Sequence, residues 1–182
     1  MPSLRVLLVA LAALLAGVSA VAAAVMLVGD DGGRPPSSST GESEPLSGPE
    51  VRLSGTDVST GAVIGLGKLE DKPVVVTVWG SWCPACPKQA EPLRRFAAAH
   101  EGTAVLAVDT QEDAEAAKAF LEASGLSLPT IADEDGHIAA KLGVRELPTT
   151  IFLTPEHRVA SMWEGQAGLD RLKEGLAAAR AG

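Results

Sequence analysis

Residues Val74–Cys86 have the sequence VVVTVWGSWCPAC, and this stretch decides the fold. Its apolar run is followed by small and turn-forming residues, which predicts a buried strand over Val74–Trp79. The residues after it favour a helix from Cys83 to about His100, kinked by Pro92. The two cysteines of the chain are therefore expected where a strand feeds the N-terminus of a helix.

Such a position favours redox chemistry. Unpaired N–H groups and the positive end of the helix dipole stabilise a thiolate, which is the form that attacks a disulfide. Cys83 is the candidate nucleophile, and Cys86 is expected one turn further along, where it can resolve a mixed disulfide. Pro84 suits the first helical position, because its missing N–H would have no partner there.

A structural disulfide or half of a metal site would also use two cysteines. A bridge that closes so short a loop restricts the unfolded chain little. A structural zinc site usually has four ligands, and only His100, His137 and His157 could join the thiols, none with ligand-like spacing to another. The pattern favours redox chemistry, so we expect neither a metal nor a cofactor.

Residues 1–28 predict a membrane anchor. No charged residue interrupts Val6–Val28, which as a helix would be about 35 Å long, against a hydrocarbon core of about 30 Å. Only Arg5 precedes the run and acidic residues follow it. We therefore expect a single pass through a bacterial cell membrane, with the later residues outside. A signal peptide cleaved near Ser19–Ala22 is the alternative, with the same outward topology.

The rest of the chain divides into a linker and one domain. Residues 29–49 are rich in Gly, Pro and Ser and predict a partly extended tether, reaching on the order of 25 Å. Residues 50–182 alternate strands and helices and finish with a late hairpin, which predicts an α/β sheet of mixed direction covered on both faces. Further elements are expected as a hairpin before residue 69, strands at 103–108, 149–153 and 158–163, and helices at 112–124, 137–142 and 169–179.

These features resemble the thioredoxin-fold proteins, and among them the TlpA/ResA-like membrane-anchored thiol-disulfide oxidoreductases. The sequence WGSWCPAC at residues 79–86 is similar to the active-site segment of that family, and LPTT at residues 147–150 to its second signature. The resemblance covers residues 51–179 and implies a thioredoxin fold. It also implies a cis peptide bond before Pro148, facing the cysteines, where a proline taken alone would be expected trans.

Four residues beside the cysteines are candidates for binding substrate. Trp82 offers apolar surface, whereas Trp79, on the strand, is expected in the core. Pro148 has no N–H, which leaves nearby backbone free to pair with an extended substrate peptide. Pro84 and Leu147, the neighbours of these residues in the two signatures, complete the set.

Two positions depart from the usual pattern of the family. Thr77 stands where thioredoxins carry a buried carboxylate, and Gln89 stands where reductases of the family often carry a glutamate. Neither side chain titrates. Glu91 is a candidate general acid or base, although a solvated surface charge is the simpler interpretation of its position.

The resemblance implies an enzyme that exchanges disulfides with proteins outside the cytoplasm. Pro84 and Ala85 include no histidine that would stabilise the thiolate further, which favours a reductase, for example in apocytochrome c maturation. Its partners would be protein disulfides or dithiols and a membrane-embedded electron donor or acceptor. A disulfide oxidase or isomerase for secreted proteins, and a non-catalytic or copper-handling module, are the alternatives. The net charge of −8 argues against binding nucleic acid.

Overall fold

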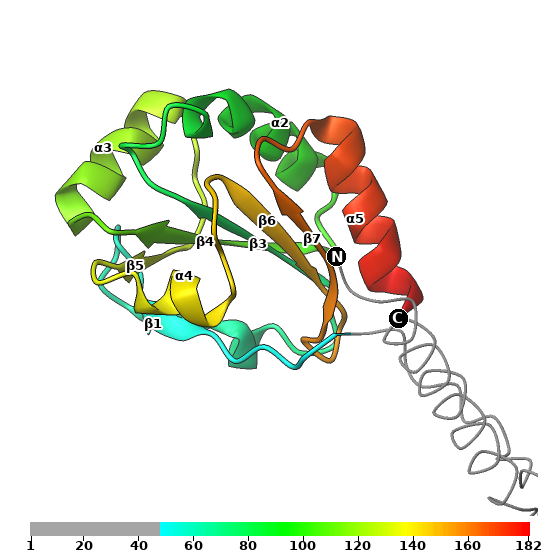
Figure 1. The fold of residues 1–182 in the computed structure, drawn as a ribbon. Helices are drawn as coiled ribbons and strands as arrows, with labels where there is room; N and C mark the ends of the chain where they lie inside the picture. Colours follow the sequence, from blue (N-terminus) through cyan, green and yellow to red (C-terminus); the bar gives the residue numbers. More distant parts are fainter. Residues whose placement is uncertain (1–47) are drawn as a thin grey trace, which may run out of the picture. The chain divides into compact units, whose positions relative to one another are not determined.

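The computed structural model describes residues 48–182, so the anchor and most of the tether predicted above lie outside the described range. Within that range, no helix is long and apolar enough to cross a membrane. A five-stranded sheet with helices on both faces, and a separate two-stranded hairpin, make up this part (Figure 1). The elements are β1 (Ser54–Thr56), β2 (Val63–Gly65), the 3-10 helix η1 (Leu66–Lys68), β3 (Val74–Trp79), α2 (Cys86–Ala99), β4 (Ala104–Thr110), α3 (Ala114–Ser124), β5 (Thr130–Asp133), α4 (His137–Lys141), β6 (Thr149–Leu153), β7 (Val159–Glu164) and α5 (Leu169–Ala181).

Strand β3 is at the centre of the sheet, whose order is β5-β4-β3-β6-β7. It runs parallel to β4 and antiparallel to β6, so the predicted sheet of mixed direction is confirmed. The end of β3 therefore lies beside the start of β6. The register pairs Val78 with Thr149, which places Pro148 next to Trp79 at this edge. The two signatures of the sequence are brought together there.

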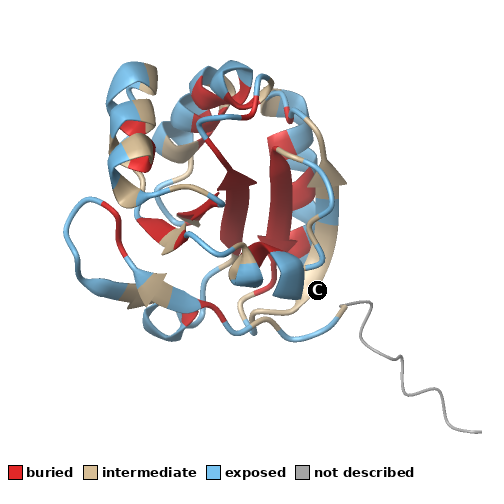
Figure 2. Cartoon of the chain, turned by 60° about the vertical axis from the view of Figure 1, so that its left-hand side comes forward, coloured by how far each residue is buried: buried red, intermediate tan, exposed pale blue. Residues whose placement is uncertain are grey.

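The core explains why β3 is apolar throughout. All six of its residues are buried, and successive side chains alternate between the two faces of the sheet. Val74, Val76 and Val78 pack towards α4 and the residues around the hairpin. Val75 and Trp79 pack towards α2, α3 and α5 on the other face. Figure 2 shows the buried central strands, with exposed outer faces on the helices around them.

Helix α2 begins at Cys86, three residues later than predicted. The Cys83 N–H donates to the carbonyl of Gly80 at 3.1 Å, and the Cys86 N–H donates to the carbonyl of Cys83 at 3.2 Å. These two bonds close turns before the helix starts. Pro87, rather than Pro84, therefore occupies the first helical turn, where a missing N–H costs little.

Helix α3 and strand β5 also differ from the predictions. Helix α3 begins at Ala114, because the Asp113 side chain caps it by accepting hydrogen bonds from two N–H groups of its first turn. The helix ends at Ser124, as predicted, and Gly125 follows it in the left-handed conformation. Strand β5 is not expected from the pattern, since it has four residues, two of them polar. It forms by parallel pairing with β4.

The segment before β3 meets both edges of the sheet. At the β7 edge, the Gly48 N–H donates to the carbonyl of Val159 at 2.6 Å. At the β5 edge, Asp57 forms an antiparallel bridge with Ile131, and its carboxylate accepts the N–H of Thr130 at 2.9 Å. Burial alone would raise the pKa of Asp57, but the hydrogen bond from Thr130 and those from Thr60 and Ser59 together lower it. One continuous stretch thus lies against both outer strands.

Candidate active site

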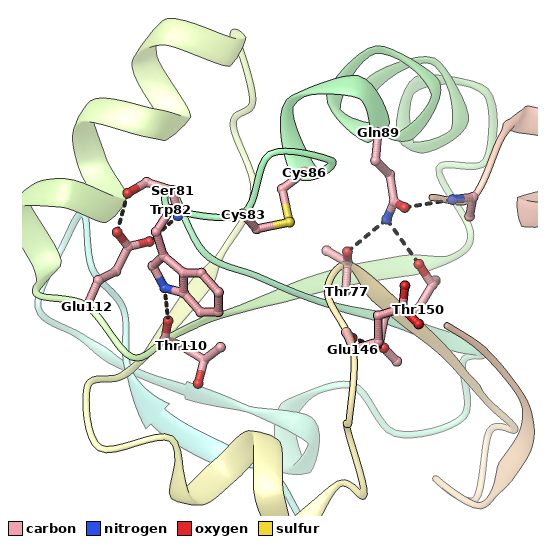
Figure 3. Close-up of a disulfide and its surroundings, with 12 residues drawn as sticks. Thr77, Ser81, Trp82, Cys83, Cys86, Gln89, Thr110, Glu112, Glu146 and Thr150 are labelled. Atoms are coloured by element: carbon pink, nitrogen blue, oxygen red, sulfur yellow. Dashed lines mark hydrogen bonds between the residues drawn. A yellow bond between two sulfur atoms is a disulfide. The ribbon is translucent and has the colours of Figure 1, made fainter. Parts of the chain in front are cut away.

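Cys83 and Cys86 form a disulfide between the end of β3 and the start of α2 (Figure 3). Their Cα atoms are 5.5 Å apart, and each side chain is only 3% exposed. Both belong to a buried apolar cluster that includes Trp79 and Ala90. No acidic residue lies in the first turn of α2, so no charge there opposes the positive end of the helix dipole. The helix N-terminus favours a thiolate when the disulfide is open, whereas burial among apolar side chains opposes it.

A groove of about 370 Å³ opens beside Cys83. Trp82, Pro84 and Leu147 line it, so three of the four substrate-binding candidates share one surface with the candidate nucleophile. The indole of Trp82 is 52% exposed, which is unusual for so large an apolar side chain. The remaining lining residues come from the end of β4 and from α4 and the loop after it: Thr110, Gln111, Gly136, Ala139, Ala140, Val144, Arg145 and Glu146.

The fourth candidate, Pro148, lies on the other side of the cysteine pair. The peptide bond between Leu147 and Pro148 is cis, as the family resemblance implied. Pro148 is buried and lines a small cavity together with Cys86 and Gln89. Leu147 therefore faces the groove, while its neighbour closes the buried side of the disulfide.

The two tryptophans of the motif have different surroundings. Trp79 is buried and stacks on Phe120 with ring centroids 4.3 Å apart, so its predicted place in the core is confirmed. The Trp82 Nε1 donates to the carbonyl of Thr110 at 3.1 Å, which ties the active-site turn to β4. A Cβ on Gly80 would lie 2.6 Å from that nitrogen, so a glycine is needed beneath the indole.

Gln89 joins four parts of the fold beneath the disulfide (Figure 3). Its Nε2 donates to the hydroxyls of Thr77 at 3.2 Å and Thr150 at 3.0 Å, and its Oε1 accepts the N–H of Ala167 at 2.8 Å. The side chain is 3% exposed. The two positions that depart from the family pattern, Thr77 and Gln89, are thus hydrogen-bonded to each other. The surroundings of Cys86 on this side are neutral.

Glu112 holds the other side of the active-site turn. One carboxylate oxygen accepts the N–H of Ser81, and the other accepts its hydroxyl (Figure 3). Ser81 is the third residue of the motif WGSWCPAC, two positions before Cys83. A carboxylate therefore fixes the turn that carries the candidate nucleophile.

Asp109 is a buried acid that was not predicted as part of the site. It ends the predicted apolar strand and is fully buried, with neither oxygen accepting a hydrogen bond within the described residues. These surroundings raise the pKa of Asp109 to about 9. Burial is the largest cause, followed by the hydrogen bond with Glu112 and the negative charge of Glu112. The charges of Asp133 and Asp113 contribute least. An aspartate directly after an apolar strand is the sequence signal, but a strand end is usually exposed.

Glu91, the candidate acid or base, lies on the surface of α2. Its carboxylate pairs with the guanidinium of Arg94 at 2.6 Å, and its side chain is 60% exposed. It lines neither the groove nor the small cavity beside Cys86. Within residues 48–182, no three His, Cys, Asp and Glu side chains are grouped so that they could hold a metal ion.

A strand, an active-site turn with a Cys-x-x-Cys disulfide, a helix and a facing cis-proline together define a thioredoxin fold. The AhpC/TSA family model matches residues 48–162, more than half of the chain, and the chain belongs to this family.

Several relatives of the chain are named as thiol-disulfide proteins. The thiol-disulfide oxidoreductase ResA of Bacillus subtilis is 30% identical over 111 residues, which are 59% of this chain and 61% of ResA. A secreted Mycobacterium tuberculosis disulfide oxidoreductase has a similar structure, with 27% identity and a TM-score of 0.63 over 69% of this chain and 95% of that chain. A secreted thiol-disulfide isomerase from Corynebacterium glutamicum is 28% identical, with a TM-score of 0.63 over 71% and 84%. The chain thus spans about three fifths of the length of ResA.

Proposed function

We propose that this protein is a thiol-disulfide oxidoreductase that reduces protein disulfides outside the cytoplasmic membrane. The observation that carries this proposal is the Cys83–Cys86 disulfide beside an open groove, with Pro148 on its buried side. A purely structural bridge has no use for a groove or for an exposed Trp82 next to it. The names of the relatives, which include oxidoreductases and an isomerase, support the same chemistry.

The reaction would transfer two electrons from the cysteine pair to the substrate. The Cys83 thiolate attacks one sulfur of a substrate disulfide, forms a mixed disulfide and releases the first substrate thiolate, which takes a proton. Cys86 then loses its proton and attacks the Cys83 sulfur, and the second substrate thiolate leaves. The protein finishes as the disulfide seen here. A reductant must reopen this disulfide before the next turnover.

The groove would select the peptide around the substrate cysteines. Ala139, Ala140 and Val144 give it an apolar floor, and Trp82 and Leu147 lie along it. Apolar side chains next to a substrate cysteine can be buried there, because each methylene removed from water contributes about 0.8 kcal/mol. An extended peptide can also pair with the backbone beside Pro148, which has no N–H.

The direction of electron flow and the cellular setting belong to the same proposal. Pro84 and Ala85 provide no cationic side chain to stabilise the thiolate further, which favours a reducing couple. An anchor at residues 1–28 would hold the domain outside the membrane, near a membrane-embedded electron donor. Oxidised apocytochrome c, with its paired cysteines, is the substrate that we propose.

Reduction of an oxidised Cys-x-x-Cys-His peptide by the reduced full-length protein tests this function. We expect Cys83→Ser to abolish reduction, and Cys86→Ser to accumulate a mixed disulfide that gel electrophoresis without reductant detects. A scrambled peptide with the same two cysteines serves as the specificity control. Activity in Cys83→Ser would exclude the proposed chemistry and favour a non-catalytic binding module.

The reduction potential of the Cys83–Cys86 couple tests the direction. Equilibration of the full-length protein with dithiothreitol or glutathione buffers should place it near cytoplasmic thioredoxins, at about −270 mV. A potential near about −120 mV, typical of a strong disulfide oxidant, would contradict the reductase assignment. It would favour the oxidase or isomerase alternative, which the name of the Corynebacterium relative also suggests.

A further inference from the structure

Asp109 lies in the layer of side chains that contains the disulfide. It pairs with Trp79 in the register of β3 and β4, so the two side chains project from the same face of the sheet. Trp79 belongs to the same buried cluster as Cys83 and Cys86, and it lines a small cavity together with Cys86. Asp109 is fully buried, and no N–H or O–H group of the described residues donates to it. Buried carboxyls without donors are rare, so this one calls for an explanation.

Glu112 connects this buried carboxyl to the active-site turn. It acts on Asp109 both through a hydrogen bond and through its charge. The same carboxylate accepts the N–H and the hydroxyl of Ser81. Asp109, Glu112 and Ser81 therefore form a chain of contacts that starts in the core and ends two residues before Cys83.

We propose that Asp109 and Glu112 share one proton, and that this proton keeps the active-site turn fastened to the end of β4. Protonated Asp109 donates to the Glu112 carboxylate, which is then held in place to accept from Ser81. Loss of the proton leaves two carboxylates in contact and drives Glu112 towards solvent. Ser81 then loses its partner, and the turn that carries Cys83 becomes looser.

The charges around Asp109 favour the protonated form. Glu112 follows β4, Asp113 caps α3 and Asp133 ends β5, and all three are acids that raise the pKa of Asp109. From β3, the facing residue is the uncharged Trp79. Burial adds to this repulsion, and the pKa of about 9 keeps the proton in place at neutral pH.

Both acids are positioning residues for the proposed reaction, because they act on Cys83 through Ser81 and the turn. This consequence for catalysis rests on the proposed function. The link between Glu112 and the active-site turn does not, since the two hydrogen bonds from Ser81 are present in the disulfide form. The two can therefore be tested separately.

Tryptophan fluorescence of the oxidised full-length protein tests the fastening. The chain has no tyrosine, and its two cysteines are locked in the disulfide, so neither group titrates near pH 9. Trp79 lies beside Asp109, and Trp82 belongs to the fastened turn. We expect a fluorescence transition near pH 9. Asp109→Asn, which keeps a donor for Glu112 but cannot ionise, should lose it.

Two further variants make the test specific. Glu112→Gln removes the neighbouring charge and should move the transition to lower pH. Glu122→Gln, an exposed carboxylate on α3, should leave it unchanged. A transition that persists in Asp109→Asn, or that is absent from the wild-type protein, would overturn the proposal. Glu112→Gln decides the question if Asp109→Asn does not fold.

The functional consequence has its own readout. The rate of disulfide reduction by Asp109→Asn, divided by the wild-type rate, should rise above pH 9, because only the wild-type turn loosens there. A ratio that stays constant with pH would contradict a positioning role. If neither protein reduces disulfides, the proposed function fails, while the fluorescence transition still decides whether the proton is shared.

Discussion

Gln89 with its threonine partners and Glu112 with Ser81 lie on opposite sides of the Cys83–Cys86 disulfide (Figure 3), and they belong to two polar clusters that are built in opposite ways. The neutral cluster comprises Gln89, Thr77, Thr150 and the N–H of Ala167, and every polar group of the Gln89 amide has a partner. The acidic cluster comprises Asp109, Glu112 and Ser81, and Asp109 accepts no hydrogen bond in it.

The difference shows how one site combines a fixed part with a responsive part. An amide and hydroxyl groups do not titrate at physiological pH, so the neutral cluster holds β3, β6 and α2 together in the same way at any such pH. The acidic cluster depends on one proton. The effect of a substitution on stability should therefore be largest in the acidic cluster, smaller in the neutral cluster and smallest at residues outside both.

Neutralising the acidic cluster should have the largest effect on stability. The pKa of Asp109 rises from 3.8 to about 9 on folding, so the folded protein holds a proton that the unfolded chain releases. The contribution of this proton to the free energy of unfolding is fully present below pH 3.8 and is lost as the pH rises towards 9. Each pH unit in this interval costs about 1.4 kcal/mol. At pH 7, Asp109→Asn should therefore be more stable than the wild type by roughly 4 kcal/mol.

Urea denaturation of the two proteins at several pH values measures this difference. Their free energies of unfolding should converge below pH 4 and diverge as the pH rises. If the free energies of unfolding of the wild type and Asp109→Asn instead changed equally with pH between neutral pH and pH 9, Asp109 would have an ordinary pKa in the folded protein. The wild-type protein denatured at the same pH values is the matched control.

Breaking the neutral cluster should have the second largest effect on stability. Gln89→Leu keeps the size of the side chain but leaves the N–H of Ala167 and the hydroxyls of Thr77 and Thr150 without this partner. We expect a loss of about 3 kcal/mol, since a buried polar group left unsatisfied costs about 1–3 kcal/mol. The loss should not vary between pH 6 and pH 9, which urea denaturation measures.

The exposed neighbour provides the control for this change. Lys88→Leu alters the same turn of α2 on its solvent side and should leave stability nearly unchanged. A loss for Gln89→Leu that grew with pH would mean that the neutral cluster is coupled to a titrating group.

Moving the indole of Trp82 should have a smaller effect. The Cβ in Gly80→Ala would displace Nε1 from the carbonyl of Thr110. We expect a loss of about 1 kcal/mol, the usual contribution of one hydrogen bond, together with a red-shifted Trp82 fluorescence. The fluorescence transition near pH 9 should become smaller in this variant. Unchanged emission would show that the indole does not depend on Gly80 for its position.

The smallest effect is expected at Glu91. Its ion pair with Arg94 is exposed, and exposed pairs contribute about 0–1 kcal/mol. Glu91→Gln should therefore retain both the stability and the peptide-reducing activity of the wild type, measured by urea denaturation and by the peptide assay. A pH profile of activity that changed in this variant would restore Glu91 as a candidate acid or base.

The sequence predicted two inner strands of the sheet, β3 and β6, to the residue, whereas β4 begins one residue and ends two residues later than predicted. Val74–Trp79 and Thr149–Leu153 are continuous apolar or β-branched runs, a pattern typical of strands that are buried on both faces. Both strands are fully buried in the structure. Helix boundaries that are set by a few local hydrogen bonds were predicted less well. The turn at Gly80–Cys83 delays α2, and the Asp113 cap delays α3.

Residues that depend on distant contacts were predicted least. The cysteines, Pro148 and the candidate substrate-binding residues could be predicted, because they belong to two short motifs that resemble the signatures of the family. Two of the three partners of Gln89 lie 61 and 78 residues away in the sequence, and no local pattern indicates that they meet. Asp109 looks like an ordinary strand end until β5 and Glu112 are packed around it.

The segment before β3 has a consequence for the protein at high concentration. Outer strands carry unpaired backbone groups and are where sheets of separate molecules join and aggregate. Gly48 and Asp57 occupy such groups on β7 and β5, respectively, so a single stretch of chain blocks part of both edges. Shortening this segment would therefore endanger solubility before it affected the cysteine chemistry.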